Sequence, residues 1–331
     1  MKSGKKMFSG REFVLGMALS MLLCACAGPD ESDLPDSFMR LSVDQSEPHR
    51  FLQYYFGGYV APQAADPFEA GMLHDFSGRF YLDLDVFAQH QPAVFDQLRD
   101  ADGNGRIEWE ELEVFIDRSY NQARGIPLSL RAFADSAGFT PDSAWMQVAL
   151  HGVMTTAERR IYVREEAVRT ALRGVAEGDG RILYPVGTIF FGEHYLDDAL
   201  TETTVMRKRA DEFWDFFVYG KDGALARGTS TPPRALKSPV QCVGCHFGNK
   251  VFEPGKSFPA MAPPGPHGPR QVYVPDEFRD AEVVLRFDEH RRRADTVLGL
   301  YGTLFVSKLR ARHRTGTLDP ADAALLEALQ F

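Results

Sequence analysis

The run GTIFFGEHYL at residues 187–196 predicts a β-strand, because aromatic and β-branched residues cluster there between turn-forming residues. Similar strand-like runs are RRIYV at 159–163, TTVMRK at 203–208 and EFWDFFVYG at 212–220, and turn signals such as EGDGR and GKDGA separate them. Between the first two runs, EEAVRTALRGV at 165–175 predicts a helix. These residues therefore predict a β-rich domain.

A C-x-x-C-H motif follows these strands as CVGCH at residues 242–246. It is the attachment signature of haem c, in which Cys242 and Cys245 form thioethers and the adjacent His246 ligates the iron on the proximal side. A redox-active disulfide, half of a zinc site and chance are the alternatives. The other two cysteines lie near the N-terminus, and the motif follows a Pro-rich loop rather than a strand, which favours haem. We therefore expect one covalent haem c.

The sixth iron ligand is a separate question. Met261 lies 15 residues after His246 and is a candidate distal thioether, although a linker methionine in its Pro/Gly-rich setting is the alternative. His194 is either close to the haem or an ordinary packed residue. The aromatic residues of the strands are candidates for the haem pocket or for plain sheet core: Phe190, Phe191, Trp214, Phe216 and Phe217.

The order of these elements, over about residues 157–259, resembles the cytochrome P-460 and cytochrome c-prime-beta family. The matching features are RRIYV, a short helix, DGRILYPVGTIFFGEHY, EFWDFFVYGKDG and CVGCH. The resemblance implies an antiparallel sheet with helices that binds one c-type haem. In cytochrome P-460 a lysine on the second strand cross-links to the haem and supports hydroxylamine oxidation, but that position aligns with Gly192. The resemblance thus implies the c-prime-beta type, a high-spin haem that takes up small gases such as nitric oxide.

A calcium-binding loop is predicted in the first half of the chain. DADGNGRIEWEE at residues 100–111 matches the EF-hand pattern D-x-[DN]-x-[DN]-G-x5-E at every position. Calcium prefers six to eight oxygen ligands, and an acidic surface turn is the alternative interpretation. The expected ligands are the side chains of Asp100, Asp102, Asn104, Glu108 and Glu111 and the backbone carbonyl of Arg106.

Helical spacing of apolar residues on both sides of this loop predicts an entering helix in PAVFDQLR and an exiting helix in ELEVFIDRSY. Ile107 occupies the position at which such loops pair with a partner loop. The segment HDFSGRFYLDLDVF at 74–87 is either a degenerate, metal-free partner hand or an ordinary loop, because it lacks the closing glutamate.

The N-terminus predicts an export signal. A basic stretch is followed by the apolar run FVLGMALSMLL at 13–23, which is too short to span a bilayer. The run ends in LCAC, which predicts a lipoprotein signal peptide at 1–25 with Cys26 as the lipid acceptor; an ordinary secretory signal or an uncleaved anchor is the alternative. We expect a flexible tether at 26–45 and, because Ala27 follows the acceptor, the outer membrane of a bacterial cell envelope, facing the periplasm.

Composition sets the remaining limits. The 331 residues are 44% hydrophobic and carry a net charge of −9, which is typical of a globular chain and argues against nucleic acid as a partner. The sequence predicts an α+β protein with a helical EF-hand region at 46–145, a P-460-like haem c domain at 150–262, and a Pro/Gly linker with a helical tail at 263–331. In that tail, Asp319 and Pro320 predict the start of a helix.

The expected activity is electron transfer to a redox partner protein, or binding of a small gaseous ligand at the haem iron. Two alternatives remain open at this point. One is a haem oxidoreductase that acts on a small nitrogen compound, and the other is a calcium-dependent interaction lipoprotein.

Overall fold

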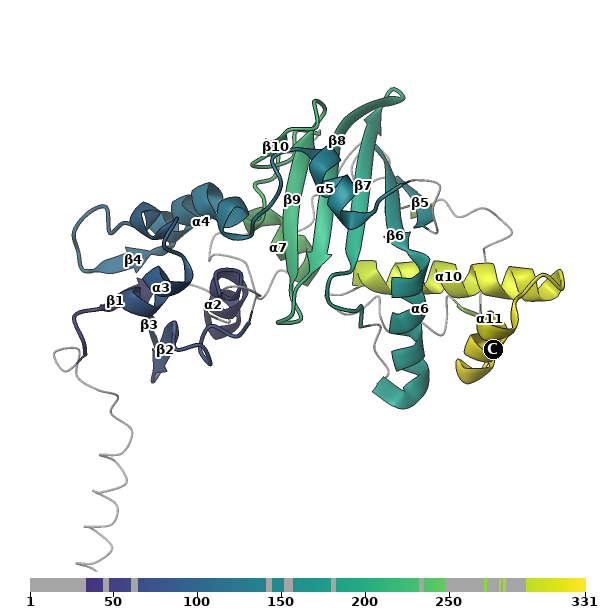
Figure 1. The fold of residues 1–331 in the computed structure, drawn as a ribbon, viewed down its shortest axis with the longest axis horizontal. Coiled ribbons are helices and arrows are strands. Elements are labelled where there is room, and N and C mark those ends of the chain that lie inside the picture. Colours follow the sequence, from purple (N-terminus) through teal and green to yellow (C-terminus); the bar gives the residue numbers. More distant parts are fainter. Residues whose placement is uncertain are drawn as a thin grey trace, which may run out of the picture.

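The part of the chain that the structure describes folds as an α+β protein with two sheets, one of them antiparallel throughout (Figure 1). The computed structural model describes residues 34–43, 48–60, 65–140, 145–151, 157–179, 183–231, 235–247, 271–272, 280, 282–283 and 296–331. The predicted signal peptide at 1–25, Cys26 and Met261 lie outside these residues. Among the helices of the described segments, none combines the length and apolar character that a bilayer crossing requires.

The larger sheet has seven strands in the order β10-β9-β8-β7-β6-β5-β11. The four strands predicted from the sequence are confirmed and lie side by side in chain order. The strands are β5 (Trp145–His151), β6 (Glu158–Arg164), β7 (Ile189–Leu196), β8 (Ala199–Lys208), β9 (Trp214–Gly220), β10 (Leu225–Ala226) and β11 (Gln271–Val272). The sheet begins at Trp145, earlier than the expected domain start at residue 150.

Side chains of successive residues point to opposite faces of this sheet, so its core is divided in two. One face carries Phe190, Trp214 and Phe216, which belong to the larger hydrophobic core of the protein. We call it the α7 face, because Val243 of helix α7 (Val240–Phe247) lies in the same core. The opposite face is covered by helix α5 (Leu130–Ala137), whose Phe133 packs edge-on against neighbouring aromatic rings of the strands.

The N-terminal region is not purely helical, contrary to the expectation for residues 46–145. It contains a four-stranded sheet in the order β2-β3-β1-β4, together with helices. The strands are β1 (Phe38–Ser42), β2 (Leu73–Phe76), β3 (Arg79–Asp83) and β4 (Arg106–Glu108). The helices are α2 (Pro48–Gly57), α3 (Leu84–His90), a 3-10 turn (Phe95–Gln97) and α4 (Trp109–Ala123).

Strand β1 also corrects the expected tether at 26–45. Residues 38–42 pair with β3 in antiparallel and with β4 in parallel orientation, and Leu41 is buried in the core. Burial of one apolar residue and pairing on both edges hold this strand in the sheet, so a flexible tether ends before Phe38.

The C-terminal tail is helical where it is described. Helix α10 (Thr296–Arg314) and helix α11 (Pro320–Ala328) pack on each other and on α6 (Glu165–Gly174), which a π-helical turn (Val175–Asp179) extends (Figure 1). The predicted start of the last helix is confirmed: the Asp319 carboxylate accepts a hydrogen bond from the Asp322 N–H, and Pro320 is the first helical residue. The buried Asp322 carboxylate accepts in turn from Arg169 of α6 at 2.8 Å.

A buried charged cluster joins the N-terminal region to the larger sheet. Asp215 of β9 is fully buried, and its carboxylate accepts hydrogen bonds from Tyr120 at 2.6 Å, from Arg124 at 3.0 Å and from Arg207 at 2.8 Å. Burial alone would raise the pKa of Asp215, but the guanidinium groups of Arg124 and Arg209 outweigh it and hold this pKa below its ordinary value. The carboxylate is therefore ionised at neutral pH and links α4 to the sheet.

Candidate functional site

The loop at residues 100–111, for which the sequence predicts calcium, folds around the Asp100 side chain. One carboxylate oxygen accepts from the backbone N–H of Gly103 at 2.8 Å and of Asn104 at 3.1 Å, and the other from the N–H of Gly105 at 2.7 Å. Loss of solvation raises the pKa of Asp100, but the hydrogen bonds from Gly105 and Asn104 outweigh it, so the pKa lies below its ordinary value. Gly105 has φ of +81°, the left-handed conformation that the sharp turn requires.

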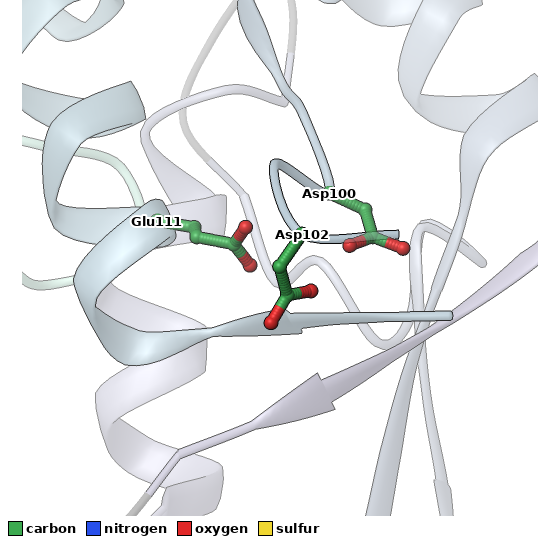
Figure 2. A group of neighbouring side chains, drawn as sticks. All are labelled: Asp100, Asp102 and Glu111. Carbon is green, nitrogen blue, oxygen red and sulfur yellow. The ribbon is translucent and has the colours of Figure 1, made fainter. Parts of the chain in front are cut away.

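The carboxylates of Asp100, Asp102 and Glu111 converge on one point (Figure 2). Each offers an oxygen, and these oxygens lie within 4.8 Å of one another. Glu111 reaches back across the loop and accepts from the Ala101 N–H at 2.5 Å and the Glu108 N–H at 3.0 Å. Oxygen-rich sites of this kind suit a hard divalent cation.

The other predicted ligands lie along the same loop. The Asn104 side-chain oxygen accepts from the Arg106 N–H at 3.0 Å, and the Asn104 amide donates to Asp102 at 2.9 Å. Arg106 and Glu108 are the ends of strand β4, and Glu108 caps α4 in a reciprocal pair with Glu111. The exiting helix is confirmed as α4, whereas the predicted entering helix is wrong.

The chain before the loop forms only the 3-10 turn Phe95–Gln97 after α3 has ended at His90. The segment at 74–87 is not a degenerate hand either: β2 and β3 form a hairpin whose tight turn has Ser77 and Gly78 at positive φ. Ile107 pairs with Leu41 of β1 instead of with a second loop.

Helix α4 connects the loop at residues 100–111 to the larger sheet and to the chain just before α7. Glu113 accepts from Lys237 at 2.8 Å, and Asp117 accepts from Arg227 at 3.2 Å. Farther along the helix, Tyr120 donates to the buried Asp215. The loop is therefore attached to the CVGCH segment through one continuous helix.

The CVGCH motif lies on α7, which is packed into the protein core. Val243 is fully buried, Cys242 is partly buried, and the Tyr55 hydroxyl donates to the Val240 carbonyl at 3.4 Å. Positions 242 and 245 are three residues apart and positions 242 and 246 are four apart, so all three lie on one side of the helix. The side chains of Cys245 and His246 lie outside the described residues.

The aromatic pocket candidates do not share one surface. Phe190, Trp214 and Phe216 lie on the α7 face. Phe191 and Phe217 point to the opposite face and pack against Phe133. The first three therefore share a core with Val243 of α7, and the other two belong to the core under α5.

Gly192 lies in the middle of the α7 face, between Ile161 and Thr204 on the neighbouring strands. A Cβ atom there would lie 2.6 Å from the Thr204 Oγ1 and 3.0 Å from the Ile161 Cδ1. A lysine at this position would require those neighbours to move.

Sequence reasoning missed the surroundings of His194. This side chain is buried on the α7 face with its Nδ1 3.5 Å from Glu202 Oε1, and burial lowers the pKa of His194 to about 3. The pair could have been found only from the strand register, because His194 lies opposite Glu202 once β7 and β8 are paired.

No family model, curated protein or solved structure shows significant similarity to this chain.

Proposed function

We propose that the chain is an exported, lipid-anchored c-type cytochrome that carries a structural calcium ion. The single observation that supports it best is the CVGCH sequence on a helix packed in the same core as the aromatic α7 face. When bound, haem c supplies an iron that takes up and releases one electron and that binds small ligands. Cys242 and Cys245 would hold the porphyrin, and His246 would ligate the iron.

The spacing on α7 fits this group, because positions 242, 245 and 246 lie on one side of the helix. Phe190, Trp214 and Phe216 offer an apolar surface in the same core. We place the domain with the P-460 and c-prime-beta family on the order of its elements, without the cross-linking lysine. Electron exchange with a redox partner, or uptake of a gas such as nitric oxide, is the activity proposed; Met261 is retained as a candidate distal ligand.

Absorption spectra of the matured protein test the haem. We expect bands of a covalent haem c, a stained haem band on a denaturing gel, and loss of both in Cys245→Ala. Cys26→Ser is the matched control, since Cys26 is the remaining cysteine of the mature chain outside the motif and its replacement should leave the haem in place. A colourless wild-type protein with two unmodified thiols would reject the assignment.

Calcium is proposed for the loop at 100–111 because its carboxylates converge and its backbone is already folded around Asp100. Calorimetric titration should give one binding site in the wild-type protein. Glu111→Gln should weaken it by about tenfold or more, because the bidentate ligand is lost. The neighbouring Glu110→Gln is the matched control, since Glu110 is exposed and is not a loop ligand. Equal affinities in both variants would contradict the assignment.

Whether calcium binding affects the haem can be measured in the same sample. If calcium only stabilises the N-terminal region, the haem bands stay constant while the melting temperature rises. A shift of the bands on calcium addition would instead indicate regulation through α4.

Export and anchoring are proposed from the LCAC sequence alone. Cys26→Ser should convert the protein from a membrane-extracted form to one released from washed envelopes, and mass spectrometry should find acyl chains on the wild type only. The proposed location is the outer membrane of the bacterial cell envelope, facing the periplasm. A wild-type protein that is released as readily as the variant would contradict the anchor.

The haem oxidoreductase is the second candidate, and the observation that favours it is the buried His194–Glu202 pair on the α7 face. Carbon monoxide binding to the reduced protein separates it from a pure electron carrier, because only an open coordination position admits the gas. A calcium-dependent interaction lipoprotein would bind partners without any spectral change.

A further inference from the structure

Three polar side chains form a continuous row on the α7 face. The Thr204 hydroxyl lies 3.2 Å from His194 Nε2, and His194 Nδ1 lies 3.5 Å from Glu202 Oε1. The strand pairing produces this arrangement, because His194 is directly opposite Glu202, and Thr204 is two residues further along the same strand. A hydroxyl, an imidazole and a carboxylate thus lie in sequence.

The carboxylate is held in place. One oxygen of Glu202 accepts from the Ser230 N–H at 2.5 Å, the Ser230 hydroxyl at 3.1 Å and the Thr231 N–H at 3.2 Å. The other oxygen and His194 Nδ1 are both buried, and neither makes a hydrogen bond within the described part of the chain. Glu202 is 1% exposed and His194 is 6% exposed, and these two buried atoms lie 3.5 Å apart.

We propose that Thr204, His194 and Glu202 form a proton relay that accepts a proton from a small ligand bound on the α7 face. The Thr204 hydroxyl lies 3.2 Å from the Gly192 carbonyl and 3.2 Å from His194 Nε2, so its single proton has two acceptors. In the proposed resting state, Glu202 orients the imidazole with its proton on Nδ1, and the Thr204 hydroxyl donates to Nε2 in place of the Gly192 carbonyl. When the ligand loses its proton to Thr204 Oγ1, the hydroxyl proton passes to Nε2. The resulting imidazolium is then stabilised by Glu202, and the number of protons is conserved.

The surroundings of the imidazole set its resting charge. Burial lowers the pKa of His194 to about 3, and the positive charge of Arg159, which faces it from β6, acts in the same sense. The imidazole is therefore neutral at pH 7 with a lone pair on Nε2, and because both effects oppose its protonation, transfer depends on a counter-charge. The Glu202 carboxylate on β8 is the opposing charge that stabilises the protonated state.

Thr204 is the end of the relay that lies nearest to solvent. Thr204 is partly exposed, whereas the two groups behind it are buried. Its hydroxyl lies directly over Gly192, where a Cβ atom would approach it to 2.6 Å. Of the three groups, Thr204 is therefore the one that a ligand on this face would meet.

The relay is also linked to the CVGCH helix. The segment that binds Glu202 continues to Ser238, whose hydroxyl donates to the Phe216 carbonyl at 2.7 Å, and then into α7.

The identity of the ligand rests on the proposed function: it would be a small molecule that binds the iron and carries an N–H, O–H or C–H proton that binding must remove.

Hydrogen cyanide is a suitable probe, because it must lose its proton when its carbon bonds to ferric iron, whereas carbon monoxide carries none. Thr204→Val should slow cyanide association by about 100-fold, the usual range for a lost acid–base group, and leave carbon monoxide association unchanged. Thr204→Ser should restore the rate. Thr203→Val is the matched control, because Thr203 is the adjacent threonine and faces the other side of the sheet. Equal cyanide rates in the two valine variants would overturn the relay.

Nitrogen-15 NMR of the histidine rings gives a readout that needs no haem. We expect the neutral Nδ1–H form of His194, with the Nε2 resonance shifted in Thr204→Val but not in Thr203→Val. A proton fixed on Nε2 would refute the proposed direction of the hydrogen bonds. If the purified protein lacks haem, the proposed function fails, while this measurement still decides whether the three groups are hydrogen-bonded as proposed.

Discussion

Replacing Asp215 by asparagine should cost about 3–5 kcal/mol of unfolding free energy, the usual loss when one partner of a buried ion pair is removed. The carboxylate is fully buried and accepts from Tyr120, Arg124 and Arg207 at 2.6–3.2 Å. An asparagine keeps a single acceptor oxygen and turns its NH₂ group toward a guanidinium. The positive charges would then lie without a counter-ion at the junction between α4 and the sheet.

Urea unfolding, followed by tryptophan fluorescence, measures this cost, since Trp214 is buried next to Asp215. Asp117→Asn is the matched control: its partner Arg227 is 68% exposed, so the loss should stay below about 1 kcal/mol. Because the folded pKa of Asp215 is depressed, its contribution is fully present above the unfolded value of about 3.9 and is lost as the pH falls through the lower folded value. Equal costs for the two variants would refute the reasoning.

Three further predictions concern stability. Burial lowers the pKa of His194 from 6.5 to about 3, so wild-type stability should fall as the pH drops through that window, and His194→Gln should show a shallower fall in urea unfolding. Phe133→Ala should lower the free energy of unfolding by about 3–5 kcal/mol, because it removes a ring whose centroid lies 4.9 Å from that of Phe217. Leu128→Ala is the control: the position is 81% exposed, so the free energy of unfolding should change by less than about 0.5 kcal/mol. Similar losses in the two variants would contradict a core divided between the two faces of the sheet. Asp319→Ala should cost about 1 kcal/mol in thermal unfolding by removing the cap of α11, and an unchanged midpoint would count against that cap.

The elements that could be predicted are those with strong local signals. The strands between residues 159 and 220 are rich in aromatic and β-branched residues and are separated by Gly/Asp turns. The loop at residues 100–111 has carboxylate and amide side chains at EF-hand spacing, and Asp319-Pro320 is a local helix start. The signal for each of these elements lies within its own stretch of sequence.

The parts that could not be predicted depend on contacts between distant segments. Strand β4 is three residues long and exists because β1, far upstream, pairs with it. The eight residues of PAVFDQLR have helical spacing but are too few to form a helix without tertiary support, and the chain takes a 3-10 turn instead. Nothing in the run FWDFF indicates that its aspartate meets arginines from β8 and α4.

The candidate site shows the same division. The CVGCH and calcium motifs are visible as spacing, but period-two alternation was needed to separate Phe190 from Phe191. The pairing of His194 with Glu202 could be predicted only from the register of β7 and β8. A β-bulge shifts this register directly after His194, so Tyr195 pairs with Leu200.

The parallel pairing of β1 with β4 has a mechanical consequence. Among the described strands β1 comes first in the chain, and it is hydrogen-bonded on one edge to β3 and on the other to β4, which lies inside the loop at 100–111. A pull on the chain before Phe38 is therefore borne by the backbone bonds of β1 to both strands, those between residues 40–42 and 106–108 among them, before it can reach the larger sheet. An ion that stiffens the loop would raise the force at which this strand peels away, which single-molecule pulling with and without calcium would record.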